Sequence, residues 1–204
     1  MGLYRRYVGP RLIALACAQS QISELRRQII PQARGVVLEI GIGPGFNLAH
    51  YDPDKVTKVI GVDPEQAFVD LAQKQVKASP VPVEIITAPG ERIPLADSTA
   101  DTAVLTYTLC SVQDPSAVLR EIRRVLKPDG RLLFLEHGRS DDAPVAAWQD
   151  RLNPLWNLIS CGCQINRDTR QLLRSVGFAI EDVDHFYLPG APKILGFHCR
   201  GVAS

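Results

Sequence analysis

The chain has 204 residues and a mass of 22.4 kDa, a length typical of one domain with a single core. Hydrophobic residues make up 46% and charged residues 22% of it, which excludes a collagen-like, coiled-coil or wholly disordered chain. The formal net charge is only +1, too small for the broad positive field that nucleic-acid binding needs. We therefore expect no nucleic-acid partner.

Cysteine usage and hydropathy indicate the compartment. The five cysteines are an odd count, too few for a disulfide scaffold, and the chain opens without the pattern of a signal peptide. We therefore expect reduced thiols and a cytoplasmic location. The charge-free run 152–166 is shorter than the roughly 18 apolar residues that a membrane span needs, so we expect no transmembrane segment.

Residues 1–34 are predicted to form an N-terminal helical segment. Apolar residues recur at helical spacing from Leu12 to Ile30, with the basic Arg26 and Arg27 among them. Two interpretations stay open. The helix covers the core, or its apolar face makes peripheral contact with a membrane surface or with the substrate.

From residue 35 onward, runs rich in Val, Ile and Leu alternate with helical patterns, which is typical of βαβ units in a parallel sheet. Helices are predicted over 65–77, 115–126 and 168–176. Residues 138–167 interrupt the alternation and are expected to form an insertion that serves as a lid or wall. The last two predicted strands form an antiparallel pair that closes the sheet. The predicted strands are 35–40, 56–62, 81–87, 101–106, 131–136, 178–187 and 194–202.

A glycine-rich turn follows the first predicted strand, where residues 38–45 read Leu-Glu-Ile-Gly-Ile-Gly-Pro-Gly. A dinucleotide fingerprint needs glycine at position 46, where this chain has Phe46, so the spacing argues against a dehydrogenase. Glycines at every second position instead allow close approach of a ligand without phosphates, such as S-adenosylmethionine. Asp63 ends the second strand, where a carboxylate either accepts hydrogen bonds from ribose hydroxyls or caps the next helix.

With two later segments, these motifs resemble the class I S-adenosylmethionine-dependent methyltransferases. Residues 88–95, Ala-Pro-Gly-Glu-Arg-Ile-Pro-Leu, and residues 119–130 are similar to motifs of the ubiquinone/menaquinone-type methyltransferase group. The resemblance implies a single α/β domain over 1–204 with a Rossmann-like fold. Its sheet would have seven strands, mostly parallel, with an antiparallel C-terminal strand.

The resemblance also implies the cofactor, S-adenosylmethionine, and the residues that hold it. Pro89 stands where the group often has an acidic residue, which implies that the backbone makes the adenine contacts there. The implied cofactor-binding residues are Glu39, Gly41, Gly43, Asp63, Pro64, Gly90, Glu91 and Thr106.

Short segments on the opposite side of the site are similar to the animal methyltransferase-like thiol S-methyltransferases. They are Leu-Cys-Ser-Val-Gln at 109–113, Leu-Glu-His at 135–137, Trp-Gln at 148–149, Pro-Leu-Trp at 154–156, Gly-Cys at 162–163 and Arg-Asp-Thr at 167–169. That resemblance implies a small thiol or hydrogen sulfide as the methyl acceptor. A thiol needs only a modest base, because its thiolate is already a strong nucleophile.

Two residues are candidates for catalysis. His137 follows the fifth strand at the edge that binds ligands, where it acts as a base or satisfies a backbone carbonyl. Glu136 orients His137 or caps a turn. Cys110 follows the fourth strand, and for it a packing role is favoured.

The insertion leaves several alternatives open. Trp148 and Trp156, eight residues apart, roof an apolar pocket or pack in the core, and Arg167 binds a carboxylate or caps the following helix. Cys161 and Cys163 together with Cys110 would suit arsenite, but Cys-x-Cys is weak zinc spacing, so no metal site is assigned.

Other functions compatible with the fold are C-, O- or N-methylation of a quinone precursor, a phenol or a phospholipid amine, and a non-catalytic cofactor-binding subunit. The sequence determines neither the methyl acceptor nor the oligomeric state.

Overall fold

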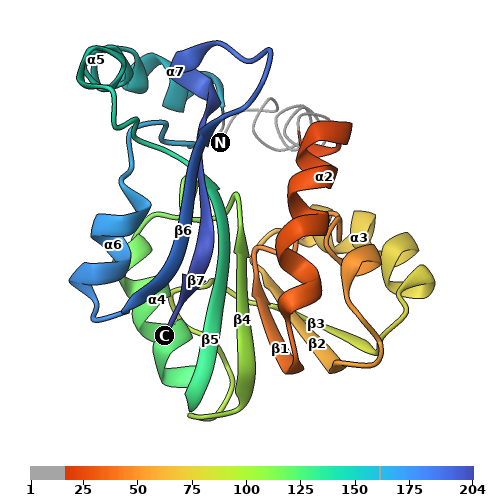
Figure 1. The fold of residues 1–204 in the computed structure, drawn as a ribbon. Coiled ribbons are helices and arrows are strands. Elements are labelled where there is room, and N and C mark those ends of the chain that lie inside the picture. Colours follow the sequence, from red (N-terminus) through yellow and green to blue (C-terminus); the bar gives the residue numbers. More distant parts are fainter. Residues whose placement is uncertain (1–16, 161) are drawn as a thin grey trace.

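A seven-stranded sheet organises the computed structural model, which describes residues 17–160 and 162–204 (Figure 1). The strand order is β3-β2-β1-β4-β5-β7-β6, and β7 alone runs antiparallel to its neighbours β5 and β6. The predicted fold class is therefore confirmed. The strands are β1 (Gly35–Ile40), β2 (Val56–Asp63), β3 (Val83–Thr87), β4 (Ala100–Thr106), β5 (Leu126–His137), β6 (Ile180–Tyr187) and β7 (Phe197–Ala203).

Helices cover both faces of the sheet and divide the core into two layers (Figure 1). One layer receives apolar side chains from α4 and α6, and the other receives them from α2 and the short turns beside it. Val37 and Leu38 are neighbours in β1 but belong to different layers, because successive side chains of a strand point to opposite faces. The helices are α2 (Ser20–Ile29), α3 (Gln66–Ala78), α4 (Pro115–Val125), α5 (Ala143–Ile159), α6 (Thr169–Ser175) and α7 (Lys193–Gly196), with 3-10 turns η2 (Ile30–Gln32) and η3 (Leu48–His50).

The order of the strands fixes where a ligand can bind. Starting from β1, the chain first builds outward through β2 and β3, and then returns to place β4 on the other side of β1. In an open α/β sheet, the crevice at such a reversal lies at the carboxyl ends of the strands. The carboxyl ends of β1, β2 and β4 are therefore the expected cofactor edge.

The N-terminal helix covers the core in the part that the structure describes. Ile22 and Ile29 of α2 are buried, as is the side chain of Arg26. The predicted apolar positions Leu12, Ile13 and Leu15 lie outside the described residues. No helix among residues 17–160 and 162–204 has both the length and the apolar composition to cross a membrane.

Three elements differ from the predicted ones by more than two residues. Residues 194–196, predicted to begin the last strand, belong to α7, where Gly196 N donates to Pro192 O, and β7 begins at Phe197. Strand β5 begins at Leu126 instead of residue 131, because the segment that stops α4 continues directly into pairing of Leu126 with Ala100. Residues 143–159 of the insertion form α5, a 17-residue helix that contains Pro154. Its Trp148 is 52% exposed, which excludes a core-packing role for this side chain.

Candidate active site

The glycine-rich turn after β1 has left-handed backbone angles at Gly41, Gly43 and Gly45 (φ 70°, 53° and 80°). The space beside each glycine differs. A Cβ on Gly41 would lie 2.5 Å from Thr108 Oγ1, and one on Gly45 would lie 3.1 Å from Gln75 Cβ. A Cβ on Gly43 would meet nothing closer than a backbone oxygen at 3.8 Å. The middle glycine therefore borders open space, whereas the outer two allow close packing.

Asp63 connects this turn to the end of β2. Its buried carboxylate accepts a hydrogen bond from Gly43 N on Oδ2 and one from Glu65 N on Oδ1, both at 2.9 Å. Burial raises the pKa of Asp63, while these two backbone hydrogen bonds oppose the rise. The carboxylate thus holds the glycine turn and the start of α3 together, and each oxygen keeps a lone pair for a ligand. Pro64 is exposed beside it.

Glu39 lies in β1, where it is only 1% exposed. It accepts hydrogen bonds from Asn47 Nδ2 at 2.9 Å and from Tyr51 Oη at 2.7 Å. Burial raises the pKa of Glu39 to about 7 despite these contacts. Asn47 also donates to Thr106 Oγ1 at 2.9 Å, and its buried Oδ1 has no partner among the described residues. The amide therefore joins Glu39 to Thr106 and keeps one acceptor free.

Asn47 and Tyr51 are site residues that the sequence reasoning missed. Asn47 stands two residues after the last glycine of the turn, which is the one signal that pointed to it. Tyr51 lies just after η3, and its position carries no motif.

Gly90 and Glu91 lie in the loop between β3 and β4. Gly90 is buried, and a Cβ there would lie 2.9 Å from Ile40 Cγ2, so glycine lets this loop pack on the end of β1. Glu91 is half-buried, and its Oε1 accepts a hydrogen bond from Asp114 N at 3.4 Å. The loop therefore borders the same edge as the glycine turn.

The hydrogen-bond acceptors at this edge fit S-adenosylmethionine. The groups that gather there are carboxylates, an amide oxygen that has no partner within residues 17–160 and 162–204, and an open glycine turn. Hydroxyl and ammonium groups need hydrogen-bond acceptors of this kind. The residues present are thus compatible with a ribose and an amino-acid moiety.

Glu136 anchors the turn that follows β4. Its Oε1 accepts hydrogen bonds from Thr108 N at 2.8 Å and from Leu109 N at 3.1 Å. The carboxyl is fully buried, and burial raises its pKa to about 7. Of the two roles considered for Glu136, the structure supports capping of a turn. Tyr107, one residue before this anchored turn, has a positive φ of 56°, a conformation that non-glycine residues keep only where surrounding contacts hold them.

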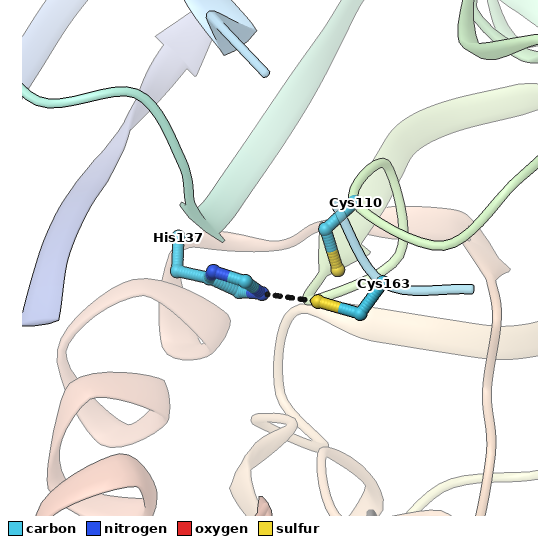
Figure 2. Close-up of side chains that lie close together, drawn as sticks. All are labelled: Cys110, His137 and Cys163. Atoms are coloured by element: carbon cyan, nitrogen blue, oxygen red, sulfur yellow. Dashed lines mark hydrogen bonds between the residues drawn. The ribbon is translucent and has the colours of Figure 1, made fainter. Parts of the chain in front are cut away.

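The two candidate catalytic residues lie together with a third side chain (Figure 2). Cys110 comes from the turn after β4, His137 is the last residue of β5, and Cys163 lies between α5 and α6. His137 Nε2 is 3.2 Å from Cys163 Sγ, and the donor atoms of all three residues lie within 4.8 Å of one another. We call these residues the thiol–imidazole cluster. Cys161, the third thiol considered for arsenite, lies outside the described residues.

The side chains of the cluster alter one another's pKa values. The contact with Cys110 and burial both raise the pKa of the Cys163 thiol. Burial lowers the pKa of His137, but the contact with Cys163 outweighs it, and the pKa lies above its ordinary value. A protonated thiol therefore faces an imidazole that readily takes a proton.

Aromatic rings fix the position of His137. The Tyr107 ring stacks on the His137 ring with centroids 6.1 Å apart, and the His198 ring makes an edge contact with Tyr107 at 5.6 Å between centroids. The Arg26 guanidinium of α2 lies 5.7 Å from the Tyr107 centroid. Burial lowers the pKa of His198 to about 4, so it is neutral at physiological pH. Sequence reasoning placed Tyr107 in an acceptor-side segment but missed His198 and Arg26 as neighbours of the site, because no local motif links them to it.

Arg167 connects the insertion to the same turn. Its guanidinium donates to the carbonyl oxygens of Leu109 and, at 2.8 Å, of Val112. Asp168 accepts a hydrogen bond from Gln171 N at 3.1 Å and caps α6. The helix cap is thus provided by Asp168, and Arg167 instead holds the loop that carries Cys163 against the turn that carries Cys110.

Comparisons with known proteins agree with this geometry. Residues 38–134 match the family described as a methyltransferase domain. The thiol S-methyltransferase TMT1B of Rattus norvegicus is 34% identical over 206 residues, covering 92% of this chain and 84% of the relative. The ubiquinone/menaquinone biosynthesis C-methyltransferase UbiE of Geobacter sulfurreducens is 37% identical over 109 residues, or 50% of this chain and 41% of the relative.

A solved structure extends the likeness to the whole fold. It is a SAM-dependent methyltransferase of Thermotoga maritima, described as a possible histamine N-methyltransferase, with a TM-score of 0.65 and 25% identity. The match covers 98% of both chains. The chain is therefore an S-adenosylmethionine-dependent methyltransferase of class I, and it belongs to the family that includes the thiol S-methyltransferase TMT1B.

Proposed function

We propose that the enzyme transfers a methyl group to the sulfur of a small thiol or of hydrogen sulfide. One observation carries the proposal. At the carboxyl end of β5, the His137 imidazole already holds a thiol sulfur, that of Cys163, at 3.2 Å. An imidazole placed in this way can accept the proton of a thiol that enters beside it. The name of the relative TMT1B points to the same class of methyl acceptor.

We assign cofactor binding to the residues at the carboxyl ends of β1, β2 and β4. Asp63 would accept hydrogen bonds from the ribose hydroxyls, and Glu39 with Asn47 Oδ1, which has no partner in the described part of the chain, would face the ammonium group. The glycine turn would let the ligand approach the backbone. The full set is Glu39, Gly41, Gly43, Asp63, Pro64, Gly90, Glu91 and Thr106.

When bound, S-adenosylmethionine supplies an electrophilic methyl group on a sulfonium. The residues of this chain then have three tasks, which are to align the thiol in line with that methyl, to exclude water and to accept a proton. A free thiol with a pKa of about 8.5 is mostly protonated at neutral pH. His137 Nε2 takes the S–H proton as the new carbon–sulfur bond forms and the bond to the sulfonium sulfur breaks.

Neighbouring residues position His137 and shape the space for the methyl acceptor. Tyr107 stacks on the imidazole and limits its rotation, while Glu136 fixes the backbone that carries Tyr107 and Cys110. Cys110 is buried beside His137, where we expect its small side chain to leave room for the sulfur of the methyl acceptor.

The test is transfer of labelled methyl groups to a panel of acceptors. It comprises hydrogen sulfide, alkyl thiols, a catechol, a quinone precursor, phosphatidylethanolamine and a blank without any acceptor. We expect transfer to the sulfur compounds. Transfer confined to the phenol, the ring carbon or the lipid amine would overturn the proposal.

The role of His137 is tested with His137→Gln and, as a matched control, His185→Gln. His185 lies outside the cluster, and its Nδ1 is 3.2 Å from an Asp141 oxygen. Loss of a general base costs about 100-fold or more, so His137→Gln should lower kcat by this order near neutral pH. The loss should shrink as the pH approaches the thiol pKa, because thiolate then forms without a base. An identical pH profile in parent and His137→Gln would exclude His137 as the base.

A further inference from the structure

The thiol–imidazole cluster combines the two ligand types that zinc prefers, and they come from three separate parts of the fold (Figure 2). Cys110, His137 and Cys163 point toward one another, with all donor atoms within 4.8 Å. In the sequence, Cys161 and Cys163 together with Cys110 suggested a site for arsenite, but Cys-x-Cys is weak zinc spacing. The fold adds the imidazole of His137 to Cys110 and Cys163.

The distances suit tetrahedral coordination. Zinc lies about 2.3 Å from a cysteine sulfur and about 2.0 Å from a histidine nitrogen, which separates two sulfurs by about 3.8 Å and a sulfur from a nitrogen by about 3.6 Å. His137 Nε2 and Cys163 Sγ are 3.2 Å apart, and the remaining pairs fall below 4.8 Å. Small rotations of the side chains are enough to reach the required separations.

Charge and access also favour a cation. Two thiolates would balance a divalent ion, and the buried Glu136 carboxyl adjoins the cluster with its Oε2 unpartnered among the described residues. His137 and Cys163 are both partly exposed, so an ion can reach them.

We propose that Cys110, His137 and Cys163 form a binding site for one thiophilic divalent cation, with Zn²⁺ as the best-matched ion. Three protein ligands leave the fourth tetrahedral position to water or to an external thiolate, as in zinc sites that exchange a ligand. The chemical class of the additional ligand is therefore a small thiolate or hydrosulfide.

The site makes a second prediction, which rests on the proposed function. The ion needs the lone pair of His137 Nε2, and the same lone pair accepts the proton of the methyl acceptor. Both cannot use it at once. Bound zinc should therefore inhibit methyl transfer, and removal of the ion should restore it.

Metal binding is tested without any assay of turnover. The reduced full-length chain, freed of metal with a chelator, is titrated with Co²⁺, whose visible and thiolate charge-transfer bands report tetrahedral coordination by sulfur. Zn²⁺ is then added to displace it. We expect one ion per chain. Cys110→Ser, Cys163→Ser and His137→Gln should each weaken binding by about tenfold or more, the size expected when a metal site is impaired.

Cys199→Ala is the matched control, because Cys199 is a buried free thiol on β7 and is not part of the cluster. It should bind the ion as the parent does. The absence of sulfur-to-metal bands, or bands that persist in Cys110→Ser and Cys163→Ser, would overturn the site. Because this measurement needs no methyl acceptor, failure of the metal site is distinguishable from failure of the proposed function.

Inhibition is tested by adding Zn²⁺ to enzyme that is methylating a thiol, followed by a chelator. Zinc also binds free thiols, so the parent is compared with Cys163→Ser at the same thiol concentration. The parent should lose activity at lower zinc concentrations than the variant and recover with the chelator. Equal inhibition of both, or activation by zinc, would overturn the proposed competition at His137.

Discussion

Glycine at position 43 has two possible roles, which are to leave space for the cofactor and to adopt a left-handed backbone conformation. Replacing Gly43 with alanine, beside a control glycine of similar conformation, distinguishes the two roles. Gly43 has φ 53°, and a Cβ there would project into open space, with Gly41 O as its nearest neighbour at 3.8 Å. Gly190 is a matched control, because it has φ 77° and a Cβ there would meet nothing within 4 Å. Both substitutions impose the same kind of left-handed strain.

The effect on stability should be similar for the two variants. An alanine in the left-handed region costs roughly 1 kcal/mol relative to glycine. For a domain of this size, such a loss lowers Tm by about 2–4 °C. Differential scanning calorimetry of Gly43→Ala and Gly190→Ala should therefore give comparable, small shifts.

The effect on cofactor affinity should differ. Only the methyl group on Gly43 would occupy the space that the ligand needs, so we expect Kd for S-adenosylmethionine to rise by about tenfold or more, which corresponds to at least about 1.4 kcal/mol. Gly190→Ala should leave Kd unchanged in isothermal titration calorimetry. If folded Gly43→Ala binds the cofactor with the affinity of the parent, the glycine turn is not the cofactor site.

Three further predictions concern single side chains. Burial raises the pKa of Glu39 and Glu136 to about 7, so the folded state favours their neutral forms. Each carboxyl should therefore lower the free energy of unfolding by up to about 3 kcal/mol as pH rises from 5 to 8. Urea denaturation should show this slope, and Glu136→Gln should reduce it; an unchanged slope would contradict the assignment. Asp63→Asn places an amide NH₂ against a backbone N–H, so calorimetry should show affinity for S-adenosylmethionine falling about tenfold, and parental affinity would remove Asp63 from the site. Trp148→Ala should leave KM for the thiol unchanged because Trp148 is exposed, and a raised KM would restore it to the acceptor pocket.

Much of the fold could be predicted because its signals are local. Strand β1 was predicted with its observed bounds, since a short apolar run leads directly into a glycine turn. Helix α5 was not predicted, because Pro154 interrupts its pattern and its apolar side chains do not follow a buried stripe. Leu155 and Leu158, for example, are more than 60% exposed. Most helices show an apolar stripe in their sequence because one face packs on the core. In α5 only Ala146 and Gln149 are buried, so such a stripe is missing.

The cofactor-binding residues and the thiol–imidazole cluster also differ in how far local sequence signals predict them. The cofactor half could be proposed from consecutive residues, because the turn and its hydrogen-bond partner Asp63 carry recognisable spacing. The residues of the thiol–imidazole cluster come from a turn, a strand end and a loop, so their approach depends on strand order and on the Arg167 contacts. Sequence reasoning had considered Cys110, His137 and Cys163, but only the fold unites them.

The position of β7 has a consequence for biosynthesis. This strand lies between β5 and β6, inside the sheet, and pairs His198 with His137. While the ribosome is still making residues 197–203, β1 to β5 can pair, but β5 has one open edge and β6 cannot join the sheet. The carboxyl ends of β1, β2 and β4, where we place the cofactor, can therefore come together during translation. The surroundings of His137 at the end of β5 are complete only after β7 has paired. Exposed strand edges promote aggregation, so this interval is when a nascent chain most needs a chaperone.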